Sequence, residues 1–94
     1  MAITNRQAVH QIACFKPFKT GNGTVFAEYV GDKYVVYSYR RSWPLMVMTP
    51  SGHIYLNAER YSVTTTRHMG LVRQAIHGRQ YTETDTAILV RMIS

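Results

Sequence analysis

Cysteine and acidic side chains are scarce in this sequence of 94 residues. Cys14 is its only cysteine, so the chain can form neither an intramolecular disulfide nor a cage of thiolate metal ligands. Five Asp and Glu residues stand against eleven Lys and Arg, which gives a formal net charge of +6. This excess favours anionic partners, such as nucleic acid, nucleotides or acidic proteins.

Long apolar runs are also missing. No segment approaches the roughly 20 apolar residues of a membrane-spanning helix, and the first residues, MAITNRQAVHQ, lack the apolar centre of a signal peptide. We therefore expect a cytoplasmic protein with no membrane partner. The length suits one globular domain, residues 1–94, because short chains struggle to build two cores.

The recognised patterns of enzymes and metal sites are absent. The GNG segment at 21–23 has neither the lysine nor the spacing of a P-loop. Glu83 and Asp85, the only neighbouring carboxylates, lie where acidic residues favour a helix start. His10 and Cys14 share a helical face, but a zinc site needs three or four ligands, and nothing indicates an activated thiolate. We expect no enzyme activity, no cofactor and no metal.

What the sequence does contain is strand-forming residues in its middle third. Four runs rich in β-branched and aromatic residues, separated by turn residues, predict strands: TVFAEYV, YVVYSY, LMVMT and HIYLN. Consecutive strands joined by short turns usually pair as neighbours, so we expect a small four-stranded antiparallel meander. Neither face of the YVVYSY run is plainly polar, which predicts a central strand.

Helices are predicted before and after this meander in the sequence, which makes the expected class α+β. Asn5 can cap an N-terminal helix that ends at about Phe15, and threonines 64–66 with Gly78 frame a helix at about 66–77. Thr82 and Asp85 resemble a capping box, which favours a C-terminal helix. The apolar run at 87–90 would equally suit a buried fifth strand, although we prefer the helix.

The start of the helix at about 66–77 is the first candidate site. Backbone N–H groups, hydroxyls and a guanidinium at a helix start can hold a phosphate or carboxylate, and here they come with Thr65, Thr66, Arg67 and His68. A structural role competes with this interpretation: the threonines can cap the helix, while His68 projects towards the apolar side and would be hydrogen-bonded and partly buried.

A second cluster, Arg40, Arg41 and Trp43, ends the YVVYSY strand, and Arg73 lies on the polar face of the predicted helix. Tryptophan and arginine dominate the hot spots of protein interfaces. Tyrosines beside these arginines could also stack on bases, although tyrosines in small sheets commonly belong to the core.

Two blocks, YVVYSYRRSWPLMVM at 34–48 and NAERYSVTTTRHMGLVRQA at 57–75, resemble a family of short bacteriophage proteins of unassigned function. In that family a YVVYSYG-like strand is followed by a W-P or F-P step and then by a KYS-x-TT-S-RH-like segment. Arg40 stands where the family often has glycine, Arg60 where lysine is usual and Thr66 where serine is usual. The resemblance covers a third to a half of the chain. It implies a phage accessory protein inside an infected bacterium, and it transfers no catalytic residue.

These observations lead to three expected functions. The first is a non-enzymatic phage accessory or host-takeover protein that inhibits a bacterial defence system, such as CRISPR, in the host cytoplasm. It would bind a protein or ribonucleoprotein target through Arg40, Arg41, Trp43, Arg67 and Arg73. The second is direct binding of nucleic acid or a nucleotide signal by the basic helix start at 65–68. The third is a minor virion or structural component.

Overall fold

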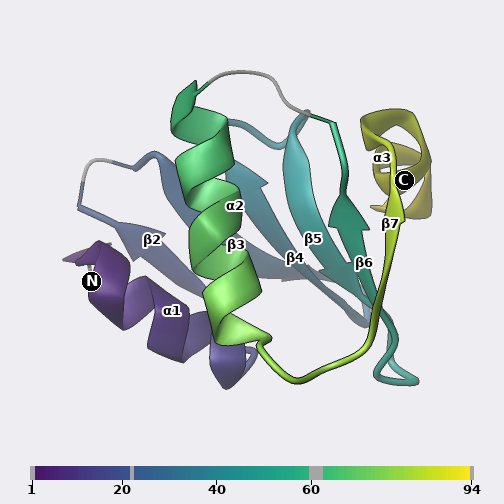
Figure 1. Cartoon of the computed structure of the whole chain (residues 1–94), viewed down its shortest axis with the longest axis horizontal. Helices are drawn as coiled ribbons and strands as arrows, with labels where there is room; N and C mark the ends of the chain where they lie inside the picture. The colour runs from purple at the N-terminus through teal and green to yellow at the C-terminus, as the bar shows by residue number, and fades with distance from the viewer. Residues whose placement is uncertain (1, 22, 60–62, 94) are drawn as a thin grey trace.

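A mixed seven-stranded sheet, in the order β1-β2-β3-β4-β5-β6-β7, organises the part of the chain that the structure describes. The structure is a computed structural model that describes residues 2–21, 23–59 and 63–93. Figure 1 shows α1 and α2 lying across one face of this sheet. In chain order the elements are β1 (Ala2–Ile3), α1 (Asn5–Ala13), β2 (Phe18–Thr20), β3 (Val25–Val30), β4 (Lys33–Ser38), β5 (Pro44–Met48), β6 (Ile54–Asn57), α2 (Val63–Ala75), β7 (Tyr81–Thr84) and α3 (Thr86–Ile93).

The predicted α+β class is confirmed, but a four-stranded antiparallel sheet is wrong. Strands β3 to β6 do form the expected antiparallel meander. Beyond it, β2 pairs antiparallel with β3, while β1 and β7 add parallel pairs at the two edges. The added strands have only two to four residues, and runs that short carry no readable periodicity. Their strand conformation depends on hydrogen bonds to a neighbouring strand.

Both faces of the sheet carry a core. On the face of α1 and α2, Tyr34 and Val36 pack with residues such as Val72 and Ile76 of α2. On the opposite face, Val35 and Tyr37 pack with Val47 and Leu89, the latter from α3. The side chains of β4 from Tyr34 to Ser38 are at most 1% exposed. The prediction that this strand is central is therefore confirmed.

The helix starts differ from those predicted. Thr4, not Asn5, caps α1: its hydroxyl accepts the Gln7 backbone N–H at 3.2 Å, and Gln7 Oε1 accepts the Thr4 N–H at 3.0 Å. This helix ends at Ala13, before Phe15, whose φ is +54°. α2 runs from Val63 to Ala75 instead of about 66–77. The offset arises because hydroxyls at three successive positions suit several alternative helix starts.

The predicted C-terminal helix is confirmed as α3, although its capping box is wrong. Thr82 lies in β7, where it pairs with Tyr55, so it cannot cap a helix. Asp85 caps α3 instead, because its Oδ1 accepts the backbone N–H of Ile88 at 2.9 Å. Within residues 2–21, 23–59 and 63–93, no helix has the length and apolar character needed to cross a bilayer.

Candidate functional site

The two predicted clusters come from elements that touch each other. The first lies in the β4–β5 connection, residues 39–43, and the second lies in the first half of α2. His68 of α2 joins them: its Nδ1 is 2.7 Å from Ser38 Oγ, and its ring centroid is 5.4 Å from that of Tyr39. The end of β4 is therefore held against α2.

Two of the predicted ligand-binding residues lie inside the protein. Thr65 is 2% exposed and His68 is 6% exposed, while Thr66 and Arg67 are exposed on the same helix. The alternative expectation for His68, a buried and hydrogen-bonded histidine, is confirmed. The side chains of Thr65 and His68 thus lie beneath the surface on which the sequence predicted an anion site.

Burial also makes His68 sensitive to pH. Desolvation lowers the pKa of its imidazole below the ordinary value of 6.5, so the neutral form is favoured in the folded protein. Below about pH 6.5 the unfolded chain binds a proton that the folded chain resists. The stability contributed by neutral His68 is therefore present above pH 6.5, and it is lost as the pH falls from there through the lower folded-state pKa.

We expect the free energy of unfolding to decrease between about pH 7.5 and about pH 5.5, and His68→Gln to remove most of that decrease. Urea denaturation at several pH values within this window measures the effect. His77→Gln, at an exposed histidine just after the same helix, is the matched control and should keep the pH dependence of the wild type. An unchanged pH dependence in His68→Gln would contradict this assignment.

Two of the predicted arginines are engaged by the protein's own side chains. Arg41 Nε and Nη2 donate to the two carboxylate oxygens of Glu28 at 2.9 and 2.8 Å. Hydrogen bonding from this guanidinium holds the pKa of the Glu28 carboxyl below its ordinary value. Arg73 pairs with Glu83 at 3.3 Å and donates to the Tyr81 hydroxyl at 3.0 Å. These pairs neutralise much of the positive charge expected at both positions.

Arg40 and Arg67 differ from those two residues. Both are exposed, and neither forms an ion pair with a carboxylate of the described residues. Tyr39, next to Arg40, is 48% exposed and contacts His68, the neighbour of Arg67. We call Tyr39, Arg40 and Arg67 the arginine surface. Trp43, predicted beside them, is half-buried and packs against the core on the α1 and α2 side.

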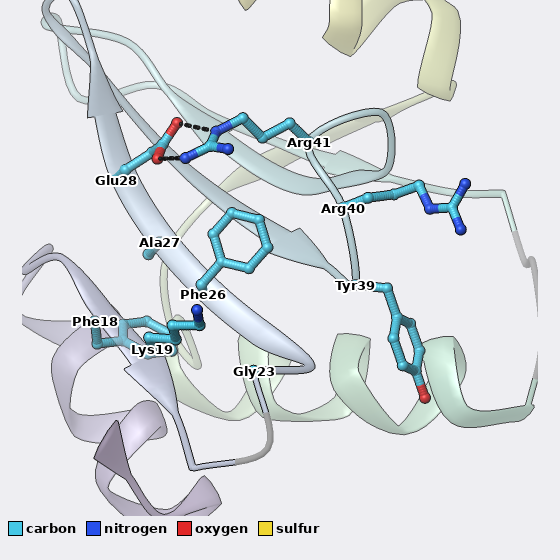
Figure 2. A pocket seen from close by; sticks show the side chains of 9 residues that line it. All are labelled: Phe18, Lys19, Gly23, Phe26, Ala27, Glu28, Tyr39, Arg40 and Arg41. Carbon is cyan, nitrogen blue, oxygen red and sulfur yellow. Dashed lines mark hydrogen bonds and ion pairs between the residues drawn. The ribbon is translucent and has the colours of Figure 1, made fainter. Parts of the chain in front are cut away.

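A hollow of about 490 Å³ lies beside the arginine surface, over β2, β3 and the β4–β5 connection. Figure 2 shows the Phe26 ring in the middle of this hollow, with the Arg41–Glu28 pair at one side and Lys19 at the other. The sequence analysis singles out neither residue, because Phe26 lies within the predicted TVFAEYV strand and Lys19 lies outside the predicted elements. The lining residues are Phe18, Lys19, Gly23, Phe26, Ala27, Glu28, Tyr39, Arg40 and Arg41.

A second hollow, of about 420 Å³, is lined by three more of the predicted residues. It lies between α2 and the β6–β7 side of the sheet and is lined in part by Thr65, Thr66 and Arg73. Glu59 and Glu83 also line it, so its two carboxylates outnumber its single guanidinium. Of the two hollows, the one beside Arg40 is therefore the better suited to an anionic ligand.

Metal ligands do not gather in the described ranges of the chain: no group of three or more His, Cys, Asp or Glu side chains there could hold an ion. His10 Nε2 and Cys14 Sγ do approach each other, at 3.9 Å, on the exposed side of α1. Two such groups fall short of the three or four protein ligands of a zinc site.

The candidate site offers side chains that can bind a ligand. Exposed Arg40 and Arg67 are the sequence neighbours of Tyr39 and His68, whose rings are in contact, and guanidinium groups and aromatic rings recognise carboxylates, phosphates and flat ring systems. No protein-family model matches this chain, and no match was found among the curated proteins or the solved structures.

Proposed function

We propose that this protein is a non-enzymatic binding protein that inhibits a macromolecular target by covering part of it with the arginine surface. The main support for this proposal is the contact of His68 with both Ser38 and Tyr39, which holds the β4–β5 connection against α2. Arg40 and Arg67 therefore project from two elements that are packed together. Binding then costs less conformational freedom than it would if the two arginines came from two separate mobile loops.

The size and charge of the chain support this proposal. A standard interface needs about 800 Å² per partner, which is a small share of the 5660 Å² of accessible surface on this protein. The net charge of +6 would speed the approach to an acidic protein or a ribonucleoprotein. A single small domain can thus supply a stoichiometric inhibitor.

The biological setting that we propose rests on the sequence resemblance described above. The blocks at 34–48 and 57–75 contain both halves of the arginine surface, and they are the blocks that resemble short phage proteins. We therefore favour a phage accessory protein that acts in the host cytoplasm on a bacterial defence complex, such as a CRISPR ribonucleoprotein. A virion component is the competing role, and it would copurify with phage particles.

The test is capture of the target by tagged protein from infected bacteria, followed by affinity measurements on the purified pair. Arg40→Ala and Arg67→Ala should each weaken binding by about tenfold or more, as arginine hot spots do. Both should also reduce protection of phage in plaque assays on bacteria that carry the defence system.

Arg79→Ala is the matched control, because it removes the same charge at the other end of the sheet. Arg79 borders the β5–β6 turn, whereas Arg40 precedes the start of β5. The control should bind and protect like the wild type. A double Arg40→Ala, Arg67→Ala variant that folds and still binds the target with wild-type affinity would rule out the arginine surface as the interface.

A further inference from the structure

We propose that the hollow beside the arginine surface binds one nucleotide unit, with the base against Phe26 and its phosphate at Lys19, while Arg40, on the opposite side of the ring, attracts a neighbouring phosphate of a strand (Figure 2). This inference rests on the proposed function, because it identifies the nucleic-acid part of a ribonucleoprotein as the chemistry that the protein contacts. The unit would come from a single strand or from a free nucleotide, since both present an unstacked base beside a phosphate.

The strand register places Lys19, Phe26 and Tyr37 in one row across the sheet. Phe26 of β3 is directly paired with Lys19 of β2 on one side and with Tyr37 of β4 on the other. Directly paired residues project from the same face of a sheet. This is the face on which α3 packs, but α3 contacts β5 and β6, which leaves the hollow over β2 and β3 open.

Phe26 has the surroundings of a stacking platform. Its ring is stacked on that of Tyr37, with the centroids 4.9 Å apart and the planes 24° from parallel. Tyr37 is 1% exposed, whereas Phe26 is half-buried and lines the hollow. The buried tyrosine therefore holds the phenylalanine ring in place, and a base that stacks on a ring already fixed loses less entropy on binding.

The charges around this ring favour a phosphate. Lys19, Arg40 and Arg41 contribute three positive charges and Glu28 one negative charge, which leaves a net charge of +2 in the hollow. Glu28 fixes the Arg41 guanidinium, which lies over the Phe26 ring at 5.6 Å. Lys19 and Arg40 are exposed, and neither forms an ion pair with a carboxylate in the part of the chain that the structure describes. Their charges can therefore act on a ligand.

The shape of the hollow is compatible with this ligand. Its volume of about 490 Å³ lies within the roughly 300–1,000 Å³ of small-ligand sites. Gly23 at its rim has a φ of +71°, and a Cβ there would lie 3.3 Å from Lys19 Cε. The glycine therefore leaves room for the lysine stem beside the hollow. An acidic peptide would satisfy the cations but would leave the Phe26 ring without a matching group.

The experiment measures binding of a labelled oligouridylate of about ten nucleotides, within the site sizes of single-strand binders, at several salt concentrations. Phe26→Leu should weaken binding by about tenfold through lost stacking. Lys19→Gln and Arg40→Gln should each weaken it and reduce the log–log salt slope by about 0.7. Glu28→Gln should strengthen binding, because it removes the only negative charge in the hollow.

Arg79→Gln is the matched control, since it removes a positive charge at the far end of the sheet, and it should bind like the wild type. Thermal unfolding of each variant checks its fold, and the exposed Lys19 and Arg40 variants keep the test valid if Phe26→Leu is unstable. Stabilisation of the wild type by uridine monophosphate would identify a free nucleotide as sufficient, whereas binding of the oligonucleotide alone would identify a strand. Either result supports the proposal.

Two results would overturn it: no binding of either probe, or an equal loss of binding in Arg79→Gln and Arg40→Gln. Failure of this inference is distinguishable from failure of the proposed function. Target capture that resists nuclease and survives Lys19→Gln and Phe26→Leu would remove the nucleotide site and leave the inhibitor role intact. Capture that survives loss of both Arg40 and Arg67 would instead rule out the arginine surface as the interface.

Discussion

Leu89→Ala is expected to lower the free energy of unfolding by about 2–5 kcal/mol, the usual cost of truncating a fully buried leucine. Leu89 is fully buried, and it is the buried side chain through which α3 packs on the sheet. Its cluster contains the buried Val35, Tyr37 and Val47, and partly buried side chains such as Met92 pack around it. Urea denaturation followed by far-UV circular dichroism measures it.

Ile88→Ala provides the matched control for this prediction. It lies on the same helix, one residue earlier, and is 46% exposed. Truncation of a side chain that remains largely in water should cost less than about 1 kcal/mol, because little apolar area leaves the interior. Equal losses in the two variants would show that helix propensity, and not packing on the sheet, determines the stability of α3.

Ser38→Ala is expected to cost about 1–3 kcal/mol, because it leaves the Nδ1 atom of buried His68 without its partner. The Ser38 Oγ to His68 Nδ1 distance is 2.7 Å, and the two residues are 1% and 6% exposed. Removing one member of a buried polar pair costs more than the hydrogen bond is worth, since the other member remains desolvated. Chemical denaturation near neutral pH, where His68 is neutral, measures the change.

A double-mutant cycle with His68→Leu isolates the pair. The double variant should be less destabilised than the sum of the two single variants, because neither buried polar group remains without a partner. Additive losses would mean that the pair contributes no coupling energy. The same cycle bears on function: Ser38→Ala should weaken target binding indirectly, since His68 holds the β4–β5 connection against α2.

The local sequence pattern was sufficient to predict the strands whose residue types show which of their faces are buried. The YVVYSY run has apolar residues on both faces, and only a strand covered on both sides can bury them, so the central position of β4 followed directly. The turn residues between the four runs likewise determined the antiparallel order of β3 to β6. The hollow beside the arginine surface was not predicted, because Phe26 cannot be distinguished in the sequence from a core residue of a strand.

The sequence by itself determined the α+β class, the meander at its centre and the basic character of the surface. Only the tertiary structure decided which arginines remain available, because Glu28 reaches Arg41 across 13 residues and Glu83 reaches Arg73 across 10. It also decided that residues 18–20 and 81–84 are strands. The physical reason is common to both: an ion pair or an edge strand needs a partner that is distant in the sequence, and only the folded chain brings the two together.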